Sequence, residues 1–190
     1  MMNSAINNRN IKSKSAVHRM ALAALAAAAL CILAPLSVPI GPVPITLAVL
    51  IVALFPYLVG VKLSVLSVAL YLLIGAIGLP VFSGFEGGIQ KLLGATGGYL
   101  VGYIPLALIG GAFIEKSKKP LVQFLGLLLG LISCYALGTA WLSAYLKLSL
   151  ASALSVAVLP FIPFDLIKLA LAVLIGRAAG KRLTVFHDRA

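Results

Sequence analysis

Two ionisable residues lie near the start of the last apolar segment of the chain, within residues 160–168 (PFIPFDLIK). Asp165 and Lys168 are three positions apart, so their side chains share one face if this segment is helical. Asp165 also falls two residues after Pro163, in the expected first turn, where the helix dipole favours a carboxylate. Ionisable groups inside an apolar span are costly and usually functional. The pair therefore predicts a polar binding site, with a structural ion pair that joins the last helix to its neighbours as the alternative.

A glycine-rich stretch at residues 78–99 is the second candidate for chemistry. Its sequence, GLPVFSGFEGGIQKLLGATGGY, contains seven glycines and separates two apolar runs. Glycine allows positive φ and lets the main chain approach a ligand closely. The stretch predicts a ligand-binding loop of defined shape, with a plain interhelical connector as the alternative. Its candidate binding residues are Phe82, Ser83, Gly87, Gly88, Lys91 and Tyr99.

The composition is that of a membrane protein. Apolar residues make up 62% of the chain and charged residues 10%, with a mean hydropathy of +1.15, far from the soluble average. The formal net charge of +11 would suit nucleic acid only if the basic residues shared a surface, but they form short clusters between apolar runs. Cys31 and Cys134 both lie inside apolar runs, which favours small core residues over a disulfide or a metal site.

The apolar runs predict an all-α integral membrane protein with six transmembrane helices. The predicted spans are residues 20–36, 45–59, 63–77, 100–114, 121–145 and 164–179. Several are shorter than the roughly 20 residues that a perpendicular crossing needs, so we expect their ends to be buried in protein or bounded by loops. Three prolines at residues 39–44 predict an extended link after the first span, and residues 149–159 predict a surface helix.

The positive charges give the orientation. With both chain ends in the cytoplasm, twelve of the fifteen lysines and arginines fall on the inner side, as the positive-inside rule requires. The exceptions are Lys91, Lys147 and Lys168. A basic stretch before a short apolar run also fits a secretory signal peptide, but removing the first span would spoil this charge pattern.

We therefore expect three regions. Residues 1–19 form a basic cytoplasmic tail that lacks order up to about residue 17, residues 20–182 form one transmembrane substrate-binding domain, and residues 183–190 form a cytoplasmic tail. The first span contains small residues at helical spacing, which allow another helix to come close. These residues either dock a partner or pack inside the bundle: Ala23, Ala24, Ala27 and Ala28.

The sequence contains no enzyme signature. Residues 176–182 (GRAAGKR) resemble a phosphate-binding loop, but they have three spacer residues instead of four and arginine in place of Ser or Thr. They also end a helix instead of opening one. We therefore expect no intrinsic ATPase, no catalytic residues, no cofactor and no metal, so uphill transport would need an ion gradient or a partner.

Four motifs in order resemble the BioY family, the biotin-specific S components of energy-coupling factor (ECF) transporters. They are GPVPITL (41–47), YLLIGAIGLPVFSG (71–84), GATGGYLVGY (94–103) and PFIPFDLIK (160–168), and the similarity runs over residues 38–182. The resemblance implies an all-helical S component in the bacterial cytoplasmic membrane, with its vitamin site near the outer face, and adds Thr46 to the candidate site.

The resemblance also implies partners: biotin, a transmembrane T subunit that docks on the small residues of the first helix, and cytoplasmic ATPase subunits that supply ATP hydrolysis. Asp165 and Lys168 suit the ureido group of biotin, which offers two N–H donors and a carbonyl. The alternative function is a self-sufficient secondary transporter of biotin or another small vitamin, although inverted repeats and several intramembrane charges, which such proteins often show, are not evident. A membrane enzyme would need a catalytic cluster.

Overall fold

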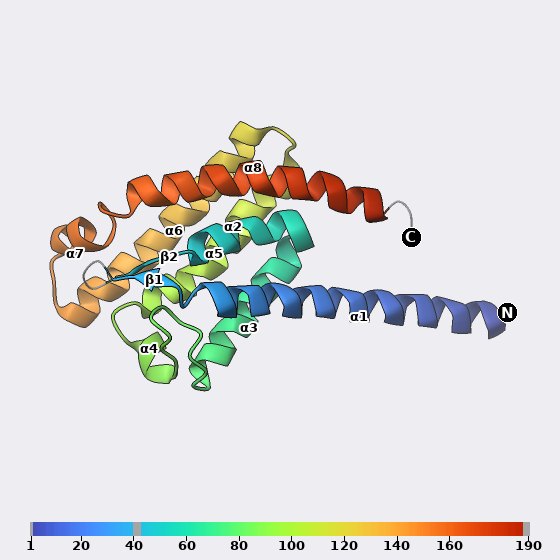
Figure 1. Cartoon of the computed structure of the whole chain (residues 1–190), viewed down its shortest axis with the longest axis horizontal. Helices are drawn as coiled ribbons and strands as arrows, with labels where there is room; N and C mark the ends of the chain where they lie inside the picture. The colour runs from blue at the N-terminus through green and yellow to red at the C-terminus, as the bar shows by residue number, and fades with distance from the viewer. Residues whose placement is uncertain (1, 40–42, 188–190) are drawn as a thin grey trace.

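The computed structural model describes residues 2–39 and 43–187, and nearly all of its regular structure is helical. The elements are α1 (Met2–Leu33), β1 (Ser37–Val38), β2 (Ile45–Thr46), α2 (Ala48–Val59), α3 (Val61–Ala76), α4 (Ile89–Leu93), α5 (Gly97–Lys116), α6 (Pro120–Leu146), α7 (Leu150–Ala157) and α8 (Ile162–His187). Each predicted apolar span falls on a helix in the expected order. The N-terminal end of α1 and the C-terminal end of α8 project from the same side of the molecule (Figure 1).

Two helices in the described chain are long and apolar enough to cross a membrane, α5 with 20 residues and α6 with 27. A third span is possible where α7 and the stretch Ile162–Ala179 of α8 qualify together, bent by 57° at their junction. The apolar helices Arg19–Leu33, α2 and α3 are shorter than this limit. These three helices are thus short for a membrane crossing, and the prediction that loops or protein bury their ends stays a prediction.

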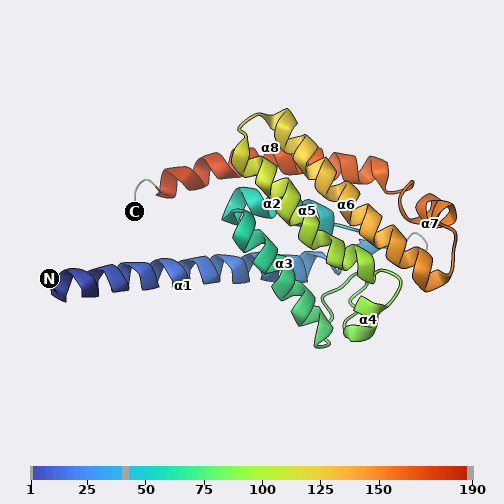
Figure 2. The same ribbon diagram turned by 180° about the vertical axis from the view of Figure 1, so that it is seen from behind.

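Helices α5 and α6 form an antiparallel pair that runs side by side along most of their length (Figure 2). Glycines on both helices allow this close packing. A Cβ added at Gly102 would lie 2.7 Å from Sγ of Cys134, and one at Gly130 would lie 3.0 Å from the carbonyl oxygen of Leu106. These distances leave no room for a side chain, so the glycines set the separation of the two helices.

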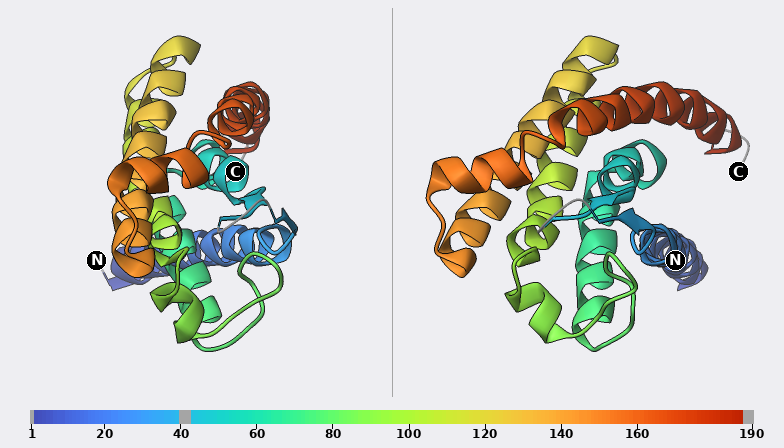
Figure 3. Two further views of the ribbon diagram at one scale, coloured as in Figure 1. Left: turned by 90° about the vertical axis from the view of Figure 1, so that its left-hand side faces the viewer. Right: turned by 60° about the vertical axis from the view of Figure 1, so that its left-hand side comes forward.

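Helix α2 lies between α1 and α8 and contacts both of them (Figure 3). Helix α3 crosses α1, where Oγ of Ser67 donates a hydrogen bond of 3.0 Å to the carbonyl of Ala23. Strands β1 and β2 pair antiparallel, with Ser37 opposite Thr46. The residues on either side of the proline-rich link thus form a short ribbon, and residues 40–42 of the predicted extended link lie outside the described residues.

The prediction for the chain ends was wrong in one respect. The sequence predicted an unordered tail up to about residue 17 and a span from 20 to 36, whereas α1 begins at Met2 and ends at Leu33. No proline or glycine lies between these residues, so a helix nucleated in the alanine run can extend backwards at little cost. Similarly, α8 continues past Gly180 to His187 because no proline follows Pro163.

Candidate functional site

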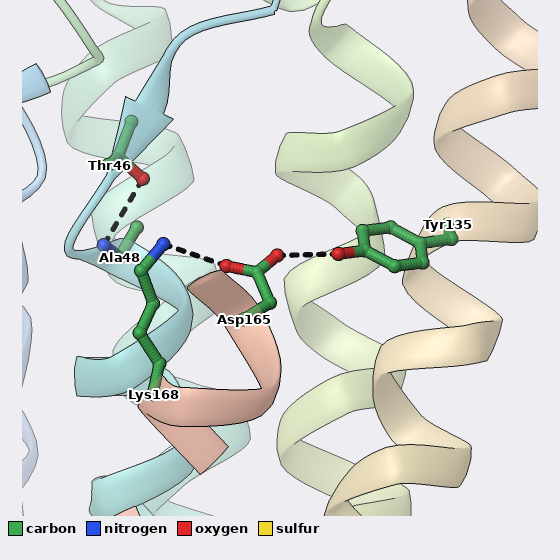
Figure 4. A network of polar contacts seen from close by, with 5 residues as sticks. All are labelled: Thr46, Ala48, Tyr135, Asp165 and Lys168. Atoms are coloured by element: carbon green, nitrogen blue, oxygen red, sulfur yellow. Dashed lines mark hydrogen bonds and ion pairs between the residues drawn. The ribbon is translucent and has the colours of Figure 1, made fainter. Parts of the chain in front are cut away.

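The carboxylate of Asp165 lies at the centre of a buried polar group. Nζ of Lys168 donates a hydrogen bond of 2.7 Å to one carboxylate oxygen, Oδ1. The hydroxyl of Tyr135, on α6, donates a hydrogen bond of 2.7 Å to the other, Oδ2. The two donors reach the carboxylate from opposite sides (Figure 4). Asp165 is only 3% exposed and Lys168 only 9%, so this is a desolvated ion pair instead of a surface one.

The break between α7 and α8 positions this carboxylate. The N–H of Phe161 donates to the carbonyl of Val158 in a tight turn, and α8 starts at Ile162. The N–H of Asp165 then donates to the carbonyl of Phe161 at 2.8 Å. Asp165 therefore lies in the first turn of α8, as the sequence predicted. There the helix dipole stabilises a negative charge.

Two small cavities lie beside one another here, with volumes of about 30 and 40 Å³, and the polar group lines the larger. Both are bounded by the same five residues: Val43, Pro44, Thr46, Tyr99 and Tyr103. Asp165, Lys168 and Tyr135 line the larger cavity, whereas Tyr71 and Ser83 line the smaller one. This arrangement offers a charged acceptor, a charged donor and aromatic walls, which is the chemistry of a binding site for a small ligand with both polar and apolar parts.

Comparison with known proteins identifies the chain. The model of the BioY family matches residues 4–185. The chain belongs to the BioY family. A relative from Thermotoga maritima, named biotin transporter BioY, is 46% identical over 141 residues, which cover 74% of this chain and 83% of that protein. A relative from Pyrococcus horikoshii, named probable biotin transporter BioY, is 42% identical and covers 83% of this chain and 93% of its own length.

A solved structure agrees with the family assignment at the level of the fold. It is a crystal structure of the S-component for biotin from an ECF-type ABC transporter, and it superposes with a TM-score of 0.82 at 33% sequence identity. The match covers 88% of this chain and 93% of the other. This BioY-family chain therefore has the fold of an S component, and its relatives are named as transporters.

The structure brings five of the predicted site residues to the two cavities. Thr46 and Tyr99 line both, Asp165 and Lys168 line the larger, and Ser83 lines the smaller. Oγ1 of Thr46 accepts a hydrogen bond of 3.2 Å from the N–H of Ala48 (Figure 4). The hydroxyls of Tyr99 and Thr139 are 3.1 Å apart and hydrogen-bonded. These local bonds fix two of the polar walls.

The other predicted residues of the glycine-rich loop lie outside these cavities. Phe82 is fully buried and packs edge-on against Tyr71, with ring centroids 5.4 Å apart, so it supports a wall instead of lining it. Lys91 forms an ion pair of 2.7 Å with Glu86. Both border an outer hollow of about 430 Å³, together with Gly87 and Thr96. Thr96 also lines the smaller cavity, so the hollow and the cavity adjoin.

Hydrogen bonds to the helices give residues 78–99 a defined shape. The N–H of Gly88 donates to the carbonyl of Gly75 at 2.7 Å, and Gly88 has a φ of 92° that suits glycine. Nε1 of Trp141 donates to the carbonyl of Gly94 at 2.9 Å. The stretch is therefore tied to α3 at its middle and to α6 in its second half.

The alanines of α1 separate into two faces. Ala23 and Ala27 are 1% and 2% exposed, on the side that packs inside the protein, whereas Ala24 and Ala28 are exposed. Packing inside the bundle therefore holds for Ala23 and Ala27. Docking of a partner stays a prediction, and it concerns Ala24 and Ala28.

Sequence reasoning missed four aromatic or sulfur side chains of the site. Tyr71, Tyr103, Cys134 and Tyr135 line the cavities, but none was proposed. Tyr135 carried a usable signal, because it lies ten residues before Tyr145, well inside the predicted fifth span. Tyrosine in membrane helices gathers at the interfaces, and a buried tyrosine hydroxyl usually has a polar partner. Among the described residues no group of three or more His, Cys, Asp or Glu could hold a metal.

Replacing Lys168 by methionine should destabilise the ligand-free protein. The change leaves the buried carboxylate of Asp165 without its counter-ion, and breaking a buried pair in this way typically costs about 3–5 kcal/mol. Thermal unfolding of the purified protein in detergent measures the effect. Lys147→Met, at the exposed C-terminus of α6, is the matched control and should unfold near the wild-type temperature. Equal midpoints for the two variants would show that the pair adds nothing to stability.

Proposed function

We propose that this chain binds biotin and serves as the substrate-specific subunit for its uptake across the bacterial cytoplasmic membrane. The observation that carries the proposal is the buried group of Asp165, Lys168 and Tyr135 beside the cavities, within the fold of an S component for biotin. The names of its relatives support the same ligand.

The polar group matches the ureido ring of biotin. A carboxylate has about four acceptor positions and an ammonium has three donors. Tyr135 and Lys168 occupy two acceptor positions of Asp165, and the bond to Asp165 uses one donor of Lys168. Asp165 can therefore accept from one ureido N–H group while Lys168 donates to the adjacent ureido oxygen. Aromatic walls at Tyr99 and Tyr103 suit the apolar thioether ring.

The carboxylate tail of biotin would then extend towards the outer hollow. Lys91, Gly87 and the neighbouring loop amides border this hollow, and Thr96 joins it to the smaller cavity. Lys91 and the amides can supply donors for the tail. The two cavities, at about 30 and 40 Å³, hold a few water molecules at most, since about 10–15 Å³ is needed for one. Binding of biotin must therefore widen the site.

The proposed topology has six spans with both ends in the cytoplasm. It is supported by the charge pattern, in which twelve of fifteen basic residues fall on the inner side, and by the common side from which α1 and α8 project (Figure 1). The chain has no phosphate-binding loop, so ATP hydrolysis would come from cytoplasmic ATPase subunits through a transmembrane T subunit.

The purified chain alone should bind biotin and discriminate against other vitamins. Equilibrium binding of radiolabelled biotin, with thiamin and riboflavin as competitors, tests this directly. We expect saturable binding that unlabelled biotin displaces and the other two do not. Displacement by thiamin or riboflavin, or no saturable binding in protein that unfolds cooperatively, would contradict the proposed function.

Asp165→Asn should weaken biotin binding by at least tenfold, or about 1.4 kcal/mol. Asparagine keeps the shape of the side chain but loses the charge and half of the acceptor capacity. Its oxygen can still accept from Lys168, so the thermal midpoint of the ligand-free protein should fall less than in Lys168→Met. Isothermal titration and thermal unfolding measure the two effects.

Glu115→Gln is the matched control for this variant. Glu115 is an exposed carboxylate at the far end of α5, where Oε1 accepts from the N–H of Val61 at 2.9 Å, and glutamine keeps that acceptor. It should bind biotin as the wild type does. Near-normal affinity in Asp165→Asn with a large fall in its midpoint would instead make the pair a structural one.

Bulky residues on the exposed face of α1 should block assembly with the T subunit. Ala24→Leu with Ala28→Leu changes only exposed positions, so biotin affinity should stay near wild type while co-purification with the T and ATPase subunits is lost. Ala140→Leu, exposed on α6, is the control. Normal assembly of the double variant would place the docking surface elsewhere, and biotin accumulation in cells without those subunits would favour a self-sufficient transporter.

A further inference from the structure

Tyr135 is the link between the ligand-binding carboxylate and a second helix. Lys168 lies on α8 with Asp165, so their ion pair cannot fix the carboxylate relative to the rest of the molecule. Tyr135 lies on α6, thirty residues away in sequence, and holds Oδ2 at 2.7 Å. The orientation of the carboxylate in the cavity therefore depends on the tyrosine as well as on its own helix.

The ring of Tyr135 is part of the wall between two different spaces. On one side is the cavity that contains Asp165 and Lys168. On the other is an apolar hollow of about 530 Å³ between α6, α7 and α8. Leu131 and Tyr135 line both spaces. The other residues of the hollow are all apolar: Leu128, Ile132, Ala136, Leu154, Val158, Ile162 and Leu166. The hydroxyl finds no competing polar side chain there, so Asp165 is its partner.

A second polar contact joins α6 to α8 at their other end. There Arg177 donates to Oε1 of Gln123 at 3.2 Å, and the hydroxyl of Tyr57 donates to the same oxygen at 3.2 Å. Gln123 lies twelve residues before Tyr135, and Arg177 lies twelve residues after Asp165. The two helices are thus held together at a site remote from the cavity, and the bond from Tyr135 is not needed for that purpose alone.

We infer that Tyr135 is a positioning residue for the binding site. It holds the Asp165 carboxylate so that the acceptor positions left free by Tyr135 and Lys168 face the cavity, where the N–H groups of a ligand can reach them. This inference rests on the proposed function for the identity of the ligand. It assigns to Tyr135 an effect on affinity that acts through Asp165 and not through the fold.

Tyr135→Phe tests the inference, because it removes the hydroxyl and keeps the ring that closes the wall. We expect biotin to bind about 5–20-fold more weakly, with the ligand-free thermal midpoint close to that of Tyr57→Phe. Tyr57→Phe is the matched control, since it removes a tyrosine hydroxyl from the remote contact of α6 and α8, and it should bind biotin normally.

A double-mutant cycle separates positioning from packing. In the Asp165→Asn background, Tyr135→Phe should weaken biotin binding by less than twofold, because the group through which it acts is already changed. Unchanged affinity of Tyr135→Phe alone would overturn the inference. The same fold-loss in both backgrounds would overturn it as well, because the tyrosine would then act independently of Asp165.

Infrared spectroscopy of the ligand-free protein tests the positioning without biotin. The chain has only four Asp and Glu residues, so the carboxylate band of Asp165 can be assigned by its loss in Asp165→Asn. Tyr135→Phe should shift this band and Tyr57→Phe should not. A band that does not move would overturn the inference. If wild-type protein failed to bind biotin while the band moved, the proposed function would fail and the positioning role would remain.

Discussion

A carboxylate and an ammonium are each expensive to remove from water, and this protein buries both within one turn at the start of α8. Such a pair is tolerated only when the geometry is good and the remaining hydrogen-bonding groups are satisfied. Both conditions are met for Asp165: each oxygen has a donor at 2.7 Å, and the carboxylate lies in the first turn of α8. The break before α8, the mid-span tyrosine of α6 and the small adjoining cavities are all arranged around this pair.

The glycines of the chain serve the same site through packing. Gly138 allows the ring of Tyr99 to lie directly against α6, because a Cβ at position 138 would overlap that ring. In the same way, Gly75 of α3 makes room for the ring of Phe82. Tyr99 lines both cavities, and the ring of Phe82 packs edge-on against Tyr71, which lines the smaller one. Rigid aromatic walls at fixed distances from a charged pair give a binding site both shape and polarity.

The sequence predicted what depends on local spacing and missed what depends on long-range contact. The sequence predicted that Asp165 and Lys168 lie together because a separation of three residues puts them on one face of a helix. The tie between Tyr135 and Asp165 joins two helices, and no local pattern encodes which tyrosine of α6 meets which residue of α8. For the same reason, helical spacing grouped the small residues of α1 but could not show that Ala23 and Ala27 face inwards. Lys91 was predicted as a candidate binding residue of the loop, but its ion pair with Glu86 was not predicted.

Both carboxylate oxygens of Asp165 already have a donor, and this affects which ligands the proposed site can accept. Because Tyr135 and Lys168 already donate to Asp165, a ligand gains nothing by supplying one more weak donor while leaving its own acceptors unpaired in a desolvated site. A planar group that carries an N–H donor next to a carbonyl loses least, since a free acceptor position of Asp165 and a free donor of Lys168 meet both needs. Ligands lacking one of these groups would leave a buried charge partly unpaired, and this penalty typically exceeds what apolar contact alone discriminates. Under the proposed function, the ion pair that the fold must stabilise is therefore also the feature by which the site excludes other small molecules.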